Sequence, residues 1–251
     1  MAHYHATFRF YADLNHFLPY ARRQTDFNHT FDGRVSIKDM IESFGIPHTE
    51  IDLIVVNGES VDFDYIVQDG DRVSVYPDFT TVDISPLIRL RPEPLDVPRF
   101  VLDIHLGRLA GYLRMLGFDA LFPENYDDEY LAEISSTENR IMLSRDRGLL
   151  IRKIVVYGYY VRSTNPREQV VEVARRYNLI PKMQPFRHCA HCNGVIEPVA
   201  KEDILHLIQP DTREYYDDFR QCTGCGRVYW PGTHFERMQA FIDEIVRQCA
   251  P

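Results

Sequence analysis

The stretch FVLDIHLGRLAGYLRMLGFDALF, residues 100–122, passes from a continuous apolar run to a helical repeat and back to an apolar run. Its first five residues are typical of a strand that is buried on both faces of a parallel sheet. Apolar residues at helical spacing then continue to Leu116, and Gly117 is typical of the residue that ends a helix. Residues 118–122 read as a second strand. The stretch therefore predicts a strand, a helix and another strand.

The same alternation continues along the chain. Residues 128–134 predict a helix, and residues 140–144 and 154–161 predict two further strands. Asn165-Pro166 then opens a helix, because an N-cap residue is followed by proline at the first helical position. Strands joined by helices in this order pair in parallel through right-handed crossovers, and helices cover both faces of the sheet. The predicted fold class is α/β, with a parallel sheet between two layers of helices in a three-layer α/β/α arrangement.

Acidic residues stand where the predicted strands end and where one helix begins. Asp103 ends the first strand, Asp146 follows the third, and Asp127 and Asp128 open the helix between them. The carboxyl ends of parallel strands share one edge, which is where open α/β sheets bind ligands. Carboxylates held close together repel one another, which costs stability. A bound divalent cation that takes oxygen ligands offsets this repulsion. The pattern predicts that all four acids hold Mg²⁺ or Mn²⁺.

A simpler interpretation exists for two of these acids. Asp127 and Asp128 lie in the first turn of a predicted helix, where acids stabilise the helix dipole without any ligand. Asp103 is different, because a charge inside an apolar strand needs a partner or a metal ion.

Charge is unevenly distributed along a chain whose net charge is −9. Residues 140–187 carry eleven Lys and Arg against three Asp and Glu, whereas residues 1–80 carry six against thirteen. A basic segment beside an acidic site is typical of contact with a phosphate backbone, although a solvated helix face is the alternative for Arg175 and Arg176. Arg145 and Arg147 flank Asp146 and are the best candidates for phosphate contact.

Two C-x-x-C pairs, Cys189/Cys192 and Cys222/Cys225, are separated by 29 residues. Four thiolates from two such knuckles complete a closed tetrahedral Zn²⁺ site, which indicates a structural role. Disulfides are the alternative for a secreted chain, and a redox motif would need only one pair near a βαβ unit. His188 and His191 beside the first knuckle are more typical of surface histidines than of substitute zinc ligands. His234 is more typical of a packing or capping residue than of a substrate contact. After the second knuckle, residues 230–234 lead into a predicted helix that has an apolar face and ends at about Gln248.

The first eighty residues predict a small domain of their own. Strands are expected near residues 5–11, 27–31, 51–56 and 72–76, with a helix over residues 36–44 that begins at a capping serine. This order suits a ubiquitin-like β-grasp domain. The expected division is a β-grasp domain over 1–80, a linker over 81–98, an α/β domain with the acidic site over 99–182 and a zinc ribbon with the C-terminal helix over 183–251.

These residues resemble the Mut-seven C-terminal RNase family, in which a PIN-like nuclease domain precedes a zinc ribbon. The matching runs are residues 106–119, 127–129, 143–149 and 226–237, together with both knuckles. The first eighty residues are similar to the ubiquitin-like domain often fused ahead of this nuclease and to the ThiS and MoaD sulfur carriers. The Gly-Gly end of a sulfur carrier is missing near residue 80, which argues against sulfur transfer.

The resemblance implies roles for individual residues. Asp103, Asp128 and Asp146 match the three acids of the PIN-like site and are the implied catalytic residues. Arg108, in the first matching run, joins Arg145 and Arg147 as a candidate substrate contact. The fourth acid of many PIN domains has no clear counterpart, since residues 163–165 follow the last strand.

The expected function is metal-dependent hydrolysis of RNA, with Mg²⁺ or Mn²⁺ for catalysis and Zn²⁺ for structure. The alternative is a non-catalytic RNA-binding or adaptor protein that recruits a protein partner through the ubiquitin-like domain. The sequence contains no apolar run of membrane-spanning length and no leader at its N-terminus, so a cytoplasmic location is expected. The RNA target and the oligomeric state stay open.

Overall fold

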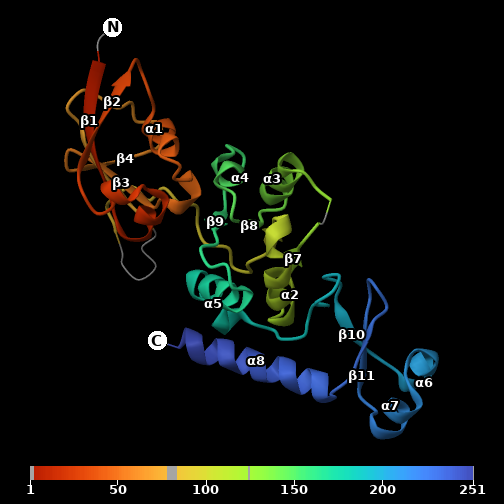
Figure 1. Ribbon diagram of the computed structural model, residues 1–251. Coiled ribbons are helices and arrows are strands. Elements are labelled where there is room, and N and C mark those ends of the chain that lie inside the picture. The colour runs from red at the N-terminus through yellow and green to blue at the C-terminus, as the bar shows by residue number, and fades with distance from the viewer. Residues whose placement is uncertain (1–2, 78–83, 124, 251) are drawn as a thin grey trace.

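A computed structural model describes residues 3–77, 84–123 and 125–250 (Figure 1). Its central element is a parallel four-stranded sheet in the order β7-β6-β8-β9. The strands are β6 (Phe100–Leu102), β7 (Ala120–Leu121), β8 (Ile141–Ser144) and β9 (Gly158–Tyr160). All three strand pairings are parallel, so the predicted α/β class and parallel sheet are confirmed.

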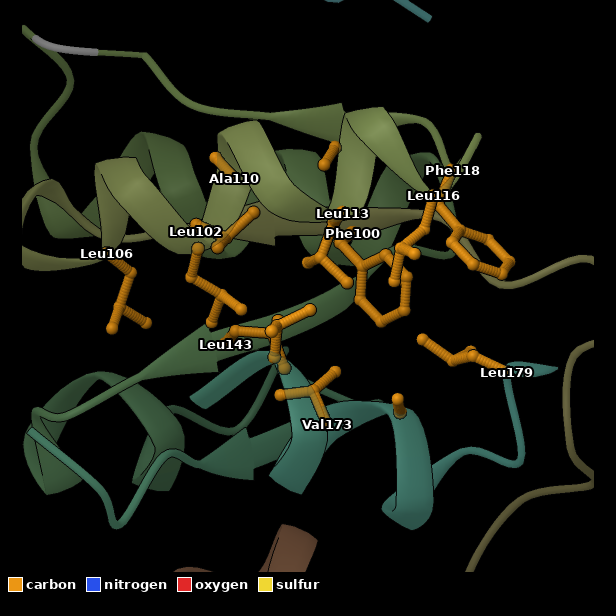
Figure 2. Close-up of a cluster of buried hydrophobic side chains, with 14 of the residues drawn as sticks. Phe100, Leu102, Leu106, Ala110, Leu113, Leu116, Phe118, Leu143, Val173 and Leu179 are labelled. Carbon is orange, nitrogen blue, oxygen red and sulfur yellow. The ribbon is translucent and has the colours of Figure 1, made fainter. Parts of the chain in front are cut away.

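Helices cover both faces of this sheet. α2 (Gly107–Met115) and α5 (Pro166–Arg176) pack on one face, and α3 (Asp128–Thr137) and α4 (Arg147–Ile151) lie on the other (Figure 1). Successive residues of a strand point to opposite faces. Phe100 and Leu102 accordingly join the core beneath α2 and α5 (Figure 2), whereas Val101 joins the core beneath α3 and α4. The three predicted layers are confirmed.

Two predicted strands are shorter than expected. The run over residues 154–161 forms a strand only at Gly158–Tyr160, because Arg152 and Val155 close a turn through a backbone hydrogen bond of 2.9 Å. The run over residues 118–122 pairs only at Ala120 and Leu121. It follows Gly117, which ends α2 as predicted with a φ of +94°. A Cβ atom there would lie 1.9 Å from the carbonyl oxygen of Gln184, so only glycine fits.

The N-terminal region forms the predicted β-grasp sheet. Its strands run in the order β2-β1-β5-β3-β4, with β1 and β5 parallel and the other pairs antiparallel. The helix α1 (Ile37–Ser43) packs on the sheet, and Ser36 caps it by accepting a hydrogen bond from the Asp39 N–H at 3.1 Å. The strands are β1 (His3–Phe10), β2 (Phe27–Asp32), β3 (Leu53–Val56), β4 (Glu59–Val61) and β5 (Arg72–Tyr76). Short 3-10 helices include η1 (Ala12–Phe17), η2 (Tyr20–Arg22) and η3 (His48–Glu50).

The C-terminal region combines a small antiparallel sheet with a long helix. The sheet contains β10 (Ile196–Val199), β11 (Phe219–Cys222) and β12 (Val228–Tyr229), and α6 (Lys201–Ile204) and α7 (Pro210–Tyr215) lie between its first two strands. The helix α8 (Thr233–Cys249) leaves this sheet and runs beneath α2 and α5 (Figure 1). Its buried residues Ile242 and Ile245 belong to the same core cluster as Phe100. The last helix therefore completes the core of the parallel-sheet domain.

The predicted linker falls partly outside the described residues, since residues 81–83 are not among them. Residues 84–98 contain no helix or strand. Within the described ranges, no helix has the length and apolar character needed to cross a membrane.

Candidate active site and metal centre

The carboxyl edge of the parallel sheet brings two predicted acids together. Asp103 follows β6 and is only 5% exposed. Its Oδ1 accepts a hydrogen bond from the His105 N–H at 2.8 Å and thereby caps the 3-10 helix η4 (Ile104–Leu106). Its Oδ2 accepts from the Arg145 N–H at 3.0 Å and from the Ser144 hydroxyl. Three donors thus compensate for the burial of this carboxylate.

Ser144 links the two acids, and sequence reasoning did not single it out. Its buried hydroxyl donates to Asp103 and accepts from the Asp146 N–H at 2.8 Å. The Asp146 side chain is exposed and caps α4, because its Oδ1 accepts from the Gly148 N–H at 2.7 Å. The signal in the sequence was the position of Ser144 as the last residue of a strand between two candidate acids.

Asp127 and Asp128 lie at the start of α3, which packs on β6 and β8 through Leu131 and Ala132. Asp127 is the N-cap and accepts from the Tyr130 N–H at 2.9 Å, and both acids are exposed. In the part of the chain that the structure describes, no hydrogen bond joins either residue to Asp103 or Asp146.

An acid that sequence reasoning missed lies beyond the end of β9. Glu168 is in the first turn of α5 and accepts a hydrogen bond from the Ser163 hydroxyl at 2.7 Å. The Asn165 side chain donates to its other oxygen at 3.5 Å. The first turn of a helix that follows a parallel strand lies at the carboxyl edge of the sheet. The available signal in the sequence was the Asn-x-x-Glu spacing, which places Glu168 three residues after the helix N-cap Asn165.

The candidate phosphate contacts differ in their surroundings. One Nη of Arg145 donates to three carbonyl oxygens beyond β9, those of Val161 at 2.9 Å, Arg162 at 2.7 Å and Ser163 at 2.6 Å. Arg145 therefore ties the end of β8 to the segment that follows β9. Arg108, in contrast, is exposed in the first turn of α2.

Arg147 points toward the ubiquitin-like region. Its guanidinium lies over the Phe17 ring at 5.1 Å from the centroid and donates to the Phe17 carbonyl at 3.2 Å. The predicted candidate contacts Arg145 and Arg147 are thus both engaged by protein groups, and Arg108 is the exposed member of the three.

The β-grasp domain covers the edge of the parallel sheet. Glu50, which is 2% exposed, accepts a hydrogen bond from the N–H of Tyr160 at 2.7 Å on the edge strand β9. Its other oxygen forms an ion pair with Arg162 at 2.7 Å. Burial alone would lower the pKa of Arg162, but the charge of Glu50 raises it above its ordinary value. An edge N–H that could otherwise recruit another chain is thereby paired.

The four cysteines of the two knuckles come together as predicted. Their sulfur atoms all lie within 4.8 Å of one another, and Cys192 and Cys222 are 3.3 Å apart. Across residues 3–77, 84–123 and 125–250, they form the one group of three or more His, Cys, Asp or Glu side chains close enough to share an ion. Four thiolates around one point suit a tetrahedral ion with no open position.

The first knuckle is hydrogen-bonded to the opposite, amino-terminal edge of the parallel sheet. Arg114 of α2 donates to the His191 carbonyl at 2.9 Å, and the Asn193 side chain accepts from the Ala120 N–H at 2.9 Å. Asn193 also donates to Asp119 at 2.6 Å. Since Asp119 and Ala120 stand at the start of β7, the cysteine cluster and the acids lie at opposite ends of the strands.

Comparison with protein-family models gives two matches. The model described as Mut7-C RNAse domain matches residues 98–242, and the model described as Mut7-C ubiquitin matches residues 3–83. No curated protein matches the chain. The first match covers the parallel sheet and the cysteine cluster, and the second covers the β-grasp sheet.

Proposed function

The chain belongs to the Mut7-C RNAse domain family, and we propose that it is a metal-dependent ribonuclease that acts at the carboxyl edge of its parallel sheet. The observation that carries the proposal is the hydrogen-bonded series from Asp103 through Ser144 to Asp146 at the ends of strands inside the matched range. An open α/β sheet binds its ligands at this edge.

The donor chemistry of this edge fits Mg²⁺ or Mn²⁺. Both are hard ions that prefer carboxylate oxygens, and Mg²⁺ keeps several waters and needs only one or two protein carboxylates. Asp103, Asp128 and Asp146 are the proposed catalytic ligands, with Asp127 beside them. The exposure of Asp128 and Asp146 leaves room for a hydrated ion and a phosphate group. A bound ion supplies an activated water and positive charge beside the phosphoryl oxygens.

The neighbouring residues have supporting roles in this proposal. Ser144 and the Arg145 N–H hold one oxygen of Asp103, which fixes the orientation of the carboxylate. The Arg145 side chain holds the segment after β9 in place. Arg108 is exposed and is the proposed contact for a phosphate of the RNA.

The experiment is cleavage of labelled single-stranded and structured RNA by zinc-loaded protein in Mg²⁺, in Mn²⁺ and without either ion. We expect cleavage that depends on the added ion and is lost in Asp146→Asn. The matched control is Asp211→Asn, because Asp211 is an exposed aspartate in α7, far from the sheet edge in sequence and in fold. Equal cleavage by wild type and Asp146→Asn would refute the assignment of the site.

A second candidate function is RNA binding without catalysis, with the ubiquitin-like domain recruiting a protein partner. It is favoured by the observation that, among the residues described, the acids do not form a compact group of metal ligands. Tight RNA binding without cleavage under any metal condition would support this candidate over the ribonuclease.

We further propose that the four cysteines bind one structural Zn²⁺. Elemental analysis of purified protein tests this directly, with one zinc per chain expected. Cys222→Ser should lose the zinc, whereas Cys249→Ser should keep it because Cys249 lies in α8 outside the cluster. Equal zinc content in both variants would contradict the proposal.

A further inference from the structure

A pocket of about 460 Å³ lies between the small antiparallel sheet and the first turn of α8. Four aromatic side chains line it, namely Phe186, Tyr229, Trp230 and Phe235. Ligand pockets commonly have this character, with a mostly apolar wall and a few polar groups. Neither the acids of the sheet edge nor the cysteine cluster is part of its lining.

The aromatic wall is held in place by its own contacts. The rings of Phe186 and Phe235 pack with their centroids 4.6 Å apart. The Tyr229 hydroxyl lies 2.9 Å from the Cys189 sulfur, so its ring is anchored to the cysteine cluster. Trp230 is 37% exposed although it belongs to this wall. A partly exposed indole offers a flat surface on which another ring can stack.

Positive charge stands beside this aromatic wall. Arg220 of β11 and Arg227 before β12 both line the pocket and are exposed, against a single acid, Asp218. Within the described ranges, neither arginine side chain makes a hydrogen bond or an ion pair. The first residues of α8 also line the pocket, and its N-cap Gly232 supplies no side-chain acceptor. Free guanidinium groups beside stacked rings suit a phosphate group attached to an aromatic base.

We propose that this pocket binds one nucleotide of a single-stranded RNA, with its base stacked on Trp230 and its phosphate held by Arg220 and Arg227. The choice of RNA rests on the proposed function. Base stacking on aromatic side chains beside arginine is the general way in which proteins hold unpaired strands. A folded duplex keeps its bases inside and cannot present one to the pocket.

The location of the pocket gives it a place in substrate recognition. The ribbon is attached at the amino-terminal edge of the parallel sheet, whereas Asp103 and Asp146 lie at the carboxyl edge. The nine residues of α2 run between these two ends, a length of about 13 Å at 1.5 Å per residue. Phe186, which lines the pocket, donates its N–H to the Met115 carbonyl at the end of α2 at 3.0 Å, so one RNA strand several nucleotides long would reach from the acids to the pocket. The pocket accordingly favours RNA substrates that have an unpaired segment of several nucleotides.

Trp230 is the one tryptophan in the sequence, so its fluorescence reports directly on the pocket. The experiment titrates zinc-loaded Asp146→Asn protein, which keeps the pocket intact, with a single-stranded RNA octamer and with a duplex of the same sequence. We expect saturable quenching by the single strand and little by the duplex. No quenching by the single strand, or equal quenching by both, would overturn the proposal.

The double variant Arg220→Ala/Arg227→Ala keeps the reporter and tests the phosphate contact. We expect its Kd for the octamer to rise about tenfold and its salt dependence to weaken, because fewer counterions are released. The matched control is Arg237→Ala, since Arg237 is an exposed arginine of α8 outside the pocket lining. An unchanged Kd in the double variant would refute the arginine assignment.

The fluorescence result is separable from the test of catalysis. Quenching by RNA in a protein whose wild type cleaves nothing would uphold the pocket and refute the ribonuclease. Cleavage by wild type without any quenching would uphold the ribonuclease and refute the pocket as an RNA site, leaving its apolar wall to a protein partner.

Discussion

The carboxylate of Glu50 in the ubiquitin-like domain forms an ion pair with the guanidinium of Arg162 in the parallel-sheet domain, at a distance of 2.7 Å. Both side chains are largely buried, and Glu50 also accepts the Tyr160 N–H of the edge strand. The ubiquitin-like domain is thus part of the structure that supports the sheet. The Arg162 carbonyl in turn accepts a hydrogen bond from Arg145, next to the candidate active site.

Replacing Glu50 should therefore destabilise the whole protein. Glu50→Gln leaves Arg162 buried without its counter-charge, and breaking a buried pair in this way costs about 3 kcal/mol. The measurement is the free energy of unfolding from urea denaturation. Glu59→Gln is the control, because Glu59 is an exposed glutamate of the same domain. Equal stability of the two variants would show that the domain contact contributes little.

Ser144 should act as a positioning residue for Asp103. Ser144→Ala removes a hydrogen bond from the buried carboxylate, and losing such a supporting contact typically lowers metal affinity or activity about tenfold or more. We expect slower RNA cleavage and a higher Mn²⁺ concentration for half-maximal rate. Ser135→Ala is the control, since that buried hydroxyl donates to the Arg140 carbonyl before β8, away from the carboxyl edge. An unchanged Mn²⁺ requirement would argue against the positioning role.

Glu168 and Glu172 should respond differently to the same substitution. Glu172 accepts hydrogen bonds from Arg162 N–H at 2.7 Å, Ser163 N–H at 3.0 Å and the Tyr159 hydroxyl at 2.9 Å, so Glu172→Gln should lower stability. Glu168 is exposed at the sheet edge, and we propose it as a supporting acid of the site, so Glu168→Gln should reduce the cleavage rate about tenfold and leave stability unchanged. Parallel rate and unfolding measurements check this, and a full cleavage rate in Glu168→Gln would remove Glu168 from the site.

Asp119 should make stability depend on pH in the acid range. Burial alone would raise its pKa, but hydrogen bonds from Arg140 and Asn193 outweigh burial and hold the pKa below its ordinary value of 3.8. A carboxyl whose pKa is lower in the folded state stabilises the protein above its unfolded pKa and loses this contribution as pH falls through the folded pKa. Asp119→Asn should therefore cost about 2 kcal/mol at pH 7.

The difference between wild type and Asp119→Asn should shrink as pH falls below about 4. Urea unfolding at a series of pH values measures it, with the exposed Asp211→Asn as the control. A difference that stays constant down to pH 3 would contradict the assigned cause.

The sequence predicted those features that depend on local pattern. The strand and helix order, the acids Asp103 and Asp146 after their strands, and the four-cysteine cluster follow from periodicity and spacing. The surroundings of Arg145 and Arg147 could not be predicted, because a basic side chain near an acid looks the same whether it faces RNA or a carbonyl. Their partners lie 16 to 18 residues away for Arg145 and 130 for Arg147.

Features that depend on tertiary contacts could likewise not be predicted from the sequence. Glu50 in the sequence is one of many acids in an acidic region, and only the docking of η3 against β9 gives it a partner. The apolar face of the last helix was predictable from Ile242 and Ile245, but its packing against the parallel-sheet core was not.

The carboxyl edge should bind a divalent ion, and calorimetric titration of Mn²⁺ into zinc-loaded protein measures this binding. We expect saturable Mn²⁺ binding by wild type, with one site lost in Asp103→Asn and retained in Asp211→Asn. Identical binding curves for wild type and Asp103→Asn, or no binding by wild type, would contradict it.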